Sequence, residues 1–186
     1  MFAKRSSFFI IFLIIGYLGI AQTGLVGYWS FDHSTTDIIK DETSFKHNGI
    51  AIGAAKIAGV KGRALYFNGD GAFVRIRGNG QKTPENISQL GVGSISLWFK
   101  AEYIPTEYGI APILYYGSTE KCDFFDAANE GLIIELGHSP IYEGNESLFF
   151  TIWKNGCTYP SFCYDSNQAI ETGKWYHFVA VVGENY

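Results

Sequence analysis

The stretch Ser94-Ile95-Ser96-Leu97-Trp98-Phe99-Lys100 alternates between two kinds of side chain with a period of two residues. In a strand, Ile95, Leu97 and Phe99 share one face. The residues between them, Trp98 included, face solvent or a second layer. Because this alternation combines with aromatic and β-branched residues, the stretch predicts a strand with one face buried against a core.

Similar short runs recur from Gly24 onward, separated by clusters of Gly, Asn, Asp and Ser, and no stretch keeps a helical period for ten residues. Aromatic residues make up 17% of the chain and glycine occurs 22 times, proportions that favour strands and turns. The other expected strands are Leu25–Phe31, Ala64–Phe67, Ala72–Ile76, Ile113–Tyr116, Leu132–Leu136, Leu148–Trp153 and Tyr176–Val182. So many strands with polar turns predict an all-β fold of two stacked antiparallel sheets.

One turn between two of these strands carries a strong hairpin signal. Asn68-Gly69-Asp70-Gly71 connects the strand expected at Ala64–Phe67 to the one expected at Ala72–Ile76. Its Asn and Gly residues tolerate positive φ, which tight hairpin turns require. We therefore expect these two strands to pair with each other.

The first 21 residues differ from the rest of the chain and have the features of a secretory signal peptide. Lys4 and Arg5 precede a run of apolar and small residues from Phe8 to Ile20, and Ala21 ends a small-residue cleavage site. The run is shorter than the about 20 apolar residues that span a bilayer, which disfavours the alternative of a membrane anchor. We expect a signal peptide at 1–21, a single domain at 22–186, and a secreted, cell-surface or periplasmic protein without a transmembrane segment.

The charge of the chain argues against nucleic acid as a partner. The formal net charge is -4, and removal of Lys4 and Arg5 with the signal peptide makes it -6. The remaining Lys and Arg residues are scattered along the sequence, so no basic face is expected that could neutralise phosphates.

A domain of this length buries a full core without help from disulfides.

The cysteines are three, an odd number in a compartment that permits disulfides. One pair and one free thiol is the simplest arrangement. Cys157 and Cys163 bracket a short loop that could fold back to join them, and Cys122 is the competing partner. A zinc site is not expected at these cysteines, because neither a CxxC motif nor a nearby pair of histidines accompanies them.

Four groups of segments occur in one order along the chain: Leu25-Val26-Gly27-Tyr28-Trp29-Ser30-Phe31-Asp32 with His47-Asn48-Gly49; Gly62-Arg63-Ala64-Leu65-Tyr66-Phe67-Asn68-Gly69 with Phe73-Val74; Ser94 to Lys100; and Lys174-Trp175-Tyr176-His177-Phe178-Val179-Ala180. In this order they resemble the laminin-G-like, concanavalin A-like jelly-roll domains of secreted and cell-surface proteins. The resemblance implies a two-sheet antiparallel jelly-roll sandwich. Because the family continues with further strands, the chain is expected to be a fragment that is incomplete at its C-terminus.

The resemblance also implies a calcium site where the first strand meets the closing strands. Carried over by position, the candidate ligands are Asp32, Asn48 and Gly49, with Asp41 as a weaker addition from the same loop. Oxygen ligands of this kind suit calcium. The alternative, given equal weight, is that Asp32 and Asn48 make only the hydrogen bonds of turns.

Catalysis is not expected. Some members of the same fold superfamily hydrolyse β-glucans with two carboxylates in an E-x-D-x-E arrangement, whereas Glu135 is the only carboxylate in its strand. The histidines lack the spacing of a zinc site or the company of a serine nucleophile. These scattered residues are His33, His47, His138 and His177.

Aromatic side chains outside the core are the expected ligand contacts, because an aromatic ring offers a flat apolar surface next to polar groups. The candidates are Trp98, Phe124, Phe125, Tyr142 and Tyr159. The first interpretation is a secreted, non-catalytic module that binds extracellular glycans, with calcium as a candidate cofactor. The second is a domain that interacts with or adheres to a cell-surface protein. The third is a module of a polysaccharide-degrading enzyme.

Overall fold

A computed structural model describes residues 24–35, 37–76, 92–105, 109–117, 131–138, 146–153, 162–166 and 169–183. Within these ranges the chain is all-β, without any helix, and its strands pair in antiparallel fashion. The described residues accordingly hold no helix long and apolar enough to cross a membrane. Contacts divide the chain into unit 1, Met1–Ser88, and unit 2, Gln89–Tyr186. The signal peptide expected at 1–21 lies outside the described residues.

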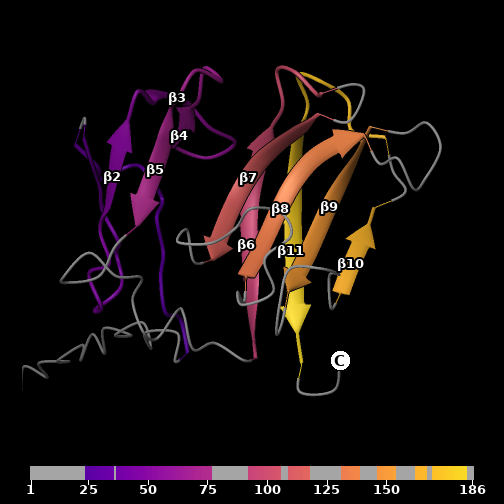
Figure 1. Ribbon diagram of the computed structural model, residues 1–186. Helices are drawn as coiled ribbons and strands as arrows, with labels where there is room; N and C mark the ends of the chain where they lie inside the picture. The colour runs from indigo at the N-terminus through magenta and orange to yellow at the C-terminus, as the bar shows by residue number, and fades with distance from the viewer. Residues whose placement is uncertain are drawn as a thin grey trace, which may run out of the picture. The chain divides into compact units, whose positions relative to one another are not determined.

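Unit 1 contains two small sheets built from short strands (Figure 1). In the first sheet β2 lies between β1 and β5, and in the second β3 pairs with β4. The strands are β1 (Ile38–Ile39), β2 (Gly49–Ile52), β3 (Ala55–Ala58), β4 (Arg63–Tyr66) and β5 (Phe73–Ile76). Two of the expected strands, at Ala64–Phe67 and Ala72–Ile76, are confirmed as β4 and β5 to within one residue at each end.

The expected pairing of β4 with β5 is wrong, because β4 pairs with β3 and β5 pairs with β2. The turn between them does contain positive φ angles, 77° at Gly69 and 66° at Gly71. It leads the chain from one sheet to the other. A nearer partner competes for β4, since the amide of Gly59 donates to the carbonyl of Gly62 at 3.0 Å and closes β3 onto β4 over a short turn. Short loops cost little entropy to close.

The strand expected at Leu25–Phe31 is also wrong, since none of these residues lies in a strand. The amide of Tyr28 donates to the side chain of Asp41 at 3.1 Å. The carbonyl of the same residue accepts from the amide of Glu42 at 2.9 Å. A carboxylate thus takes one of the places that a neighbouring strand would fill, and Phe31 turns the chain with a φ of 68°.

Unit 2 contains a four-stranded sheet in the order β10-β9-β8-β7 and a ribbon in which β6 pairs with β11. The strands are β6 (Gly93–Lys100), β7 (Ile110–Gly117), β8 (Gly131–His138), β9 (Glu146–Trp153), β10 (Phe162–Asp165) and β11 (Trp175–Val182). All five strands expected in this part of the sequence are confirmed. β10 was not expected, and its first two residues, Phe162 and Cys163, belong to the stretch interpreted as a disulfide loop.

The core of unit 2 lies between the ribbon and the four-stranded sheet, in the sandwich-like arrangement that Figure 1 shows. Inward side chains of β6 and β11 meet those of β8 and β9, and the rings of Phe150 and Phe178 lie 5.9 Å apart. The most buried members are Phe99, Ala101, Ile104, Ile134, Leu136, Leu148, Phe150, Ile170 and Ala180. Burial of each large apolar side chain contributes about 1.5–3 kcal/mol, so this core is the main stabilising element of unit 2.

Candidate functional site

The carboxylate of Asp41, at 0% exposure, lies at the centre of a hydrogen-bond network in unit 1. Oδ1 accepts from the amides of Tyr28 at 3.1 Å and Thr43 at 2.9 Å. Oδ2 accepts from the hydroxyl of Thr43 and the amide of His47, each at 2.8 Å. These four bonds hold the opening segment against the turn that precedes β2.

The network sets the ionisation of Asp41. Burial by itself would raise its pKa, but the hydrogen bonds from Thr43, Tyr28 and His47 outweigh burial and hold the pKa below its usual value. The group is therefore charged at neutral pH, and backbone amides stabilise its negative charge.

The other expected calcium ligands also bond to backbone amides. Oδ1 of Asn48 accepts from the amide of Asp41 at 2.9 Å, and Oδ1 of Asp32 accepts from the amide of Arg63 at 2.6 Å. Gly49 is the first residue of β2. The bond at Asp32 joins residues far apart in the sequence, so it is not the local turn hydrogen bond that was the alternative to calcium.

The structure brings Asp41 and Asn48 into contact and gives Asp32 a different partner. In the part of the chain that the structure describes, no group of three or more His, Cys, Asp or Glu residues could hold a metal ion. Calcium binding stays a prediction.

A smaller polar cluster lies on the surface of the same unit. Oε1 of Glu42 accepts from the hydroxyl of Ser30 and lies 3.1 Å from Nδ1 of His33. The hydrogen bond from Ser30, followed by that from His33, lowers the pKa of Glu42. A serine nucleophile needs a base on its hydroxyl and a third group behind that base. Here the carboxylate lies between serine and histidine, so the cluster lacks that order.

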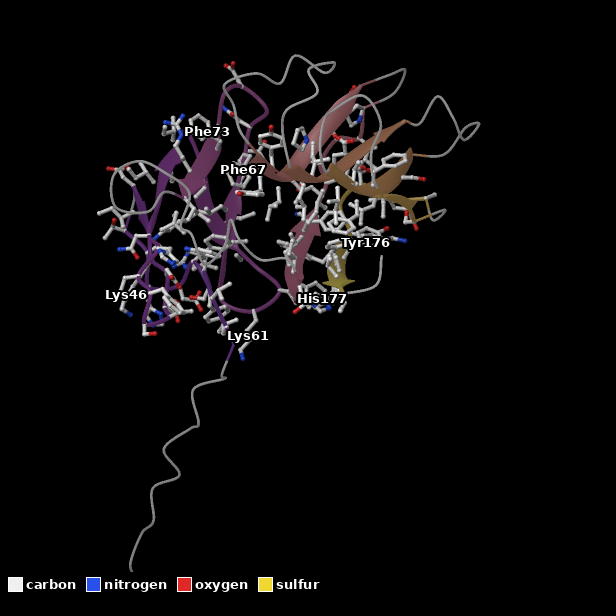
Figure 2. The ribbon with its side chains drawn as sticks, turned by 60° about the horizontal axis from the view of Figure 1, so that its bottom comes forward. Lys46, Lys61, Phe67, Phe73, Tyr176 and His177 are labelled. Atoms are coloured by element: carbon white, nitrogen blue, oxygen red, sulfur yellow. The ribbon has the colours of Figure 1, made fainter. Side chains whose placement is uncertain are left out.

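Trp98 lies on the outer face of the β6–β11 ribbon, as the sequence predicts, with 53% of its surface exposed. Its indole stacks on the imidazole of His177, with ring centroids 4.7 Å apart and planes within 18°. The two residues are opposite each other in the register of the ribbon (His177 is labelled in Figure 2). Oγ of Ser96 lies 2.9 Å from Nε2 of His177. An exposed aromatic surface thus adjoins polar groups, and we call Trp98, His177 and Ser96 the Trp98 platform.

The same face of the ribbon continues along β11 with two exposed apolar side chains, those of Val179 and Val181. Alternation places both on the side of His177, away from the core of unit 2. Exposed apolar surface of this kind is a common feature of binding faces.

The outer face of the four-stranded sheet carries Glu135, which the sequence identified only as a lone strand carboxylate. Its neighbours Ile134 and Leu136 belong to the core, so Glu135 points away from it. Burial raises the pKa of Glu135, and its Oε2 atom is buried without a hydrogen-bond partner among the residues that the structure describes. Ser147, a residue that the sequence did not single out, has an Oγ atom in the same condition.

The remaining candidates fall outside the described residues. These are the aromatic residues Phe124, Phe125, Tyr142 and Tyr159 and the cysteines Cys122 and Cys157. Cys163 lies in β10, where it is opposite Thr151 of β9. Both the Cys157–Cys163 disulfide and the alternative with Cys122 stay predictions.

Comparison of the chain with protein-family models, with curated proteins and with solved structures finds no match. The resemblance to laminin-G-like domains therefore rests on the sequence segments quoted above.

Proposed function

We propose that this chain is a secreted, non-catalytic module that binds glycans through the Trp98 platform, in a jelly-roll domain of the concanavalin A-like type. The observation that carries the proposal is the exposed indole of Trp98 beside the polar atoms of Ser96 and His177. The sandwich-like core of unit 2 and the expected signal peptide at 1–21 support the fold and the location.

The chemistry of the platform suits a sugar ring. One side of a pyranose ring is lined with C–H groups that pack on an aromatic surface, and its hydroxyls need hydrogen-bond partners. Stacking on His177 holds the indole of Trp98 in one orientation. A side chain that is already ordered loses less entropy when a ligand binds, which favours affinity.

A glycan array tests the proposal directly. The secreted chain is applied with calcium and again with a chelator, together with Trp98→Ala and with Tyr103→Ala as a matched control. Tyr103 is 70% exposed and lies outside the platform. We expect glycan hits that Trp98→Ala weakens strongly and Tyr103→Ala keeps at full strength. Hits that keep their full strength in Trp98→Ala contradict the platform, and a folded chain without any hits contradicts glycan binding. Hits lost with the chelator would support the predicted calcium site.

A second candidate function is interaction with a cell-surface protein, and the exposed Val179 and Val181 next to the platform favour it. Apolar side chains that continue along one strand suit a flat protein partner better than a single sugar ring. Binding of the chain to protease-treated cells distinguishes the two functions. Glycan binding predicts that binding survives removal of surface proteins, whereas protein interaction predicts that it is lost.

A further inference from the structure

Glu135 and Ser147 lie close together on the outer face of the sheet formed by β7 to β10. In the register of β8 and β9, Glu135 is opposite Phe149 and Gly137 is opposite Ser147. Ser147 is therefore the diagonal neighbour of Glu135 on one face, within reach of a common ligand atom. Gly137 contributes no side chain between them.

Each of the two residues has a polar atom that is shielded from solvent and lacks a hydrogen-bond partner in the described part of the chain. The atoms are Oε2 of Glu135 and Oγ of Ser147, and Ser147 is 1% exposed. Buried polar atoms in folded proteins almost always have partners, so two orphans side by side require an explanation. Glu135 as a whole is of intermediate exposure, whereas its Oε2 atom is shielded from solvent.

The neighbouring side chains make this position unfavourable for a charge. Phe149 and Ile133 on the same face are buried and apolar. Burial accordingly raises the pKa of Glu135. A partner for this carboxyl group that is itself neutral avoids the cost of burying a charge next to these side chains.

From this geometry we propose that Glu135 and Ser147 form a second ligand-binding position, separate from the Trp98 platform, which takes a neutral hydroxyl group of a polyhydroxyl compound such as a sugar. One ligand hydroxyl satisfies both orphans, because its hydrogen is donated to Oε2 of Glu135 and its oxygen accepts from the hydroxyl of Ser147. An ammonium group donates only. It would leave the hydrogen of Ser147 without an acceptor.

The proposal makes an unusual joint prediction about Ser147→Ala. Because the hydroxyl has no partner among the described residues, its removal should leave the melting temperature unchanged or raise it. The same substitution should weaken sugar binding about fivefold, which corresponds to the loss of one hydrogen bond. A structural role for Ser147, for instance through a bridging water, predicts the opposite effect on the melting temperature.

The experiment uses the Trp98→Ala background, so that it reports on the second position alone. Saturation-transfer NMR measures binding of methyl α-D-glucoside and methyl α-D-galactoside to the secreted chain, with methylammonium as the charged comparison. Ser94→Ala is the matched control, because Ser94 lies exposed on the ribbon. We expect sugar signals that weaken with Ser147→Ala and with Glu135→Leu, and that persist with Ser94→Ala.

Four results overturn the proposal. They are the absence of sugar signals in the Trp98→Ala background, signals that Ser147→Ala leaves unchanged, a melting temperature that Ser147→Ala lowers, and binding of methylammonium in preference to the sugars. Failure of the Trp98 platform is recognised separately, because the array hits then have the same strength in Trp98→Ala as in the unchanged chain.

Discussion

Asp41 in unit 1 and Glu135 in unit 2 are both carboxyl groups with oxygen atoms shielded from solvent, yet their pKa values shift in opposite directions. Asp41 accepts four hydrogen bonds from its own chain, whereas Oε2 of Glu135 accepts none from the residues described. Hydrogen bonds to the charged form outweigh the effect of burial in the first case, and burial alone acts in the second. Burial of a carboxylate by itself therefore does not determine the direction of its pKa shift; the hydrogen bonds that it accepts must be known as well. The hydrogen bonds of Asp41 assign it to the fold, whereas the missing partner of Glu135 Oε2 among the described residues is the basis of the proposed second position.

The largest expected effect of breaking this comparison is that of Asp41→Ala. The substitution leaves the amides of Tyr28, Thr43 and His47 without their acceptor, and it should destabilise unit 1 by about 3 kcal/mol or more. Urea denaturation combined with hydrogen exchange at the Tyr28 amide measures the loss. Asp41→Asn keeps one carbonyl oxygen as an acceptor, so it should lower the free energy of unfolding less than Asp41→Ala does. If Asp41→Ala has the stability of the unchanged chain, the network is not structural.

A smaller effect is expected at the turn that Asp32 holds. Gly62 has a φ of 66°, and a Cβ atom there would overlap the carboxylate of Asp32. Gly69 has a φ of 77° with nothing near its Cβ position. Both substitutions by Ala cost about 1 kcal/mol of backbone strain. The free energy of unfolding should fall by about 1 kcal/mol more in Gly62→Ala than in Gly69→Ala, because Gly62→Ala also displaces Asp32 from the amide of Arg63. Equal losses in urea denaturation would show that Asp32 does not stabilise this turn.

The pH dependence of stability sharpens the same contrast. The lowered pKa of Asp41 stabilises the fold above the pKa of the unfolded chain, about 3.9, and this contribution is lost as the pH falls through the lower, folded value. The raised pKa of Glu135 acts in the other direction. Its destabilising effect is absent below the unfolded value, about 4.3, and grows as the pH rises through the higher, folded value.

The smallest effect is therefore expected for Glu135→Gln, which removes the second of these two contributions. At pH 7 it should leave stability unchanged or raise it by less than about 1 kcal/mol, and the gain should vanish near pH 4. Thermal unfolding at a series of pH values measures this difference. Glu171→Gln is the control, because Glu171 is exposed in an ion pair with Lys174 and should change little. A gain that persists at pH 4 would contradict the assignment.

The sequence predicted unit 2 better than unit 1, and the reason is strand length. Alternation over eight residues, as in Gly93–Lys100, specifies both a strand and its buried face. The strands of unit 1 have two or four residues, too few for alternation to choose a partner, and a nearer turn at Gly59 redirected β4. Leu25–Phe31 alternates like a strand, but a side chain supplies one of its main hydrogen bonds.

The candidate site was predicted in part. The outward position of Trp98 followed from alternation, whereas its contact with His177 depends on the register between β6 and β11, which alternation does not supply. The proximity of Glu135 and Ser147 could not be predicted either, because it depends on the register between β8 and β9. Glu135 looked like an isolated carboxylate until the pairing of β8 with β9 brought Ser147 next to it.

An NMR titration of the carboxyl carbons of Asp41 and Glu135, with and without methyl α-D-glucoside or methyl α-D-galactoside, tests the central contrast most directly. The account predicts a pKa below the usual aspartate value for Asp41 that neither sugar moves. It predicts a pKa above the usual glutamate value for Glu135, and a Glu135 signal that moves when a sugar binds. Shifts of both pKa values in one direction, or a Glu135 signal that no sugar moves, would contradict the account.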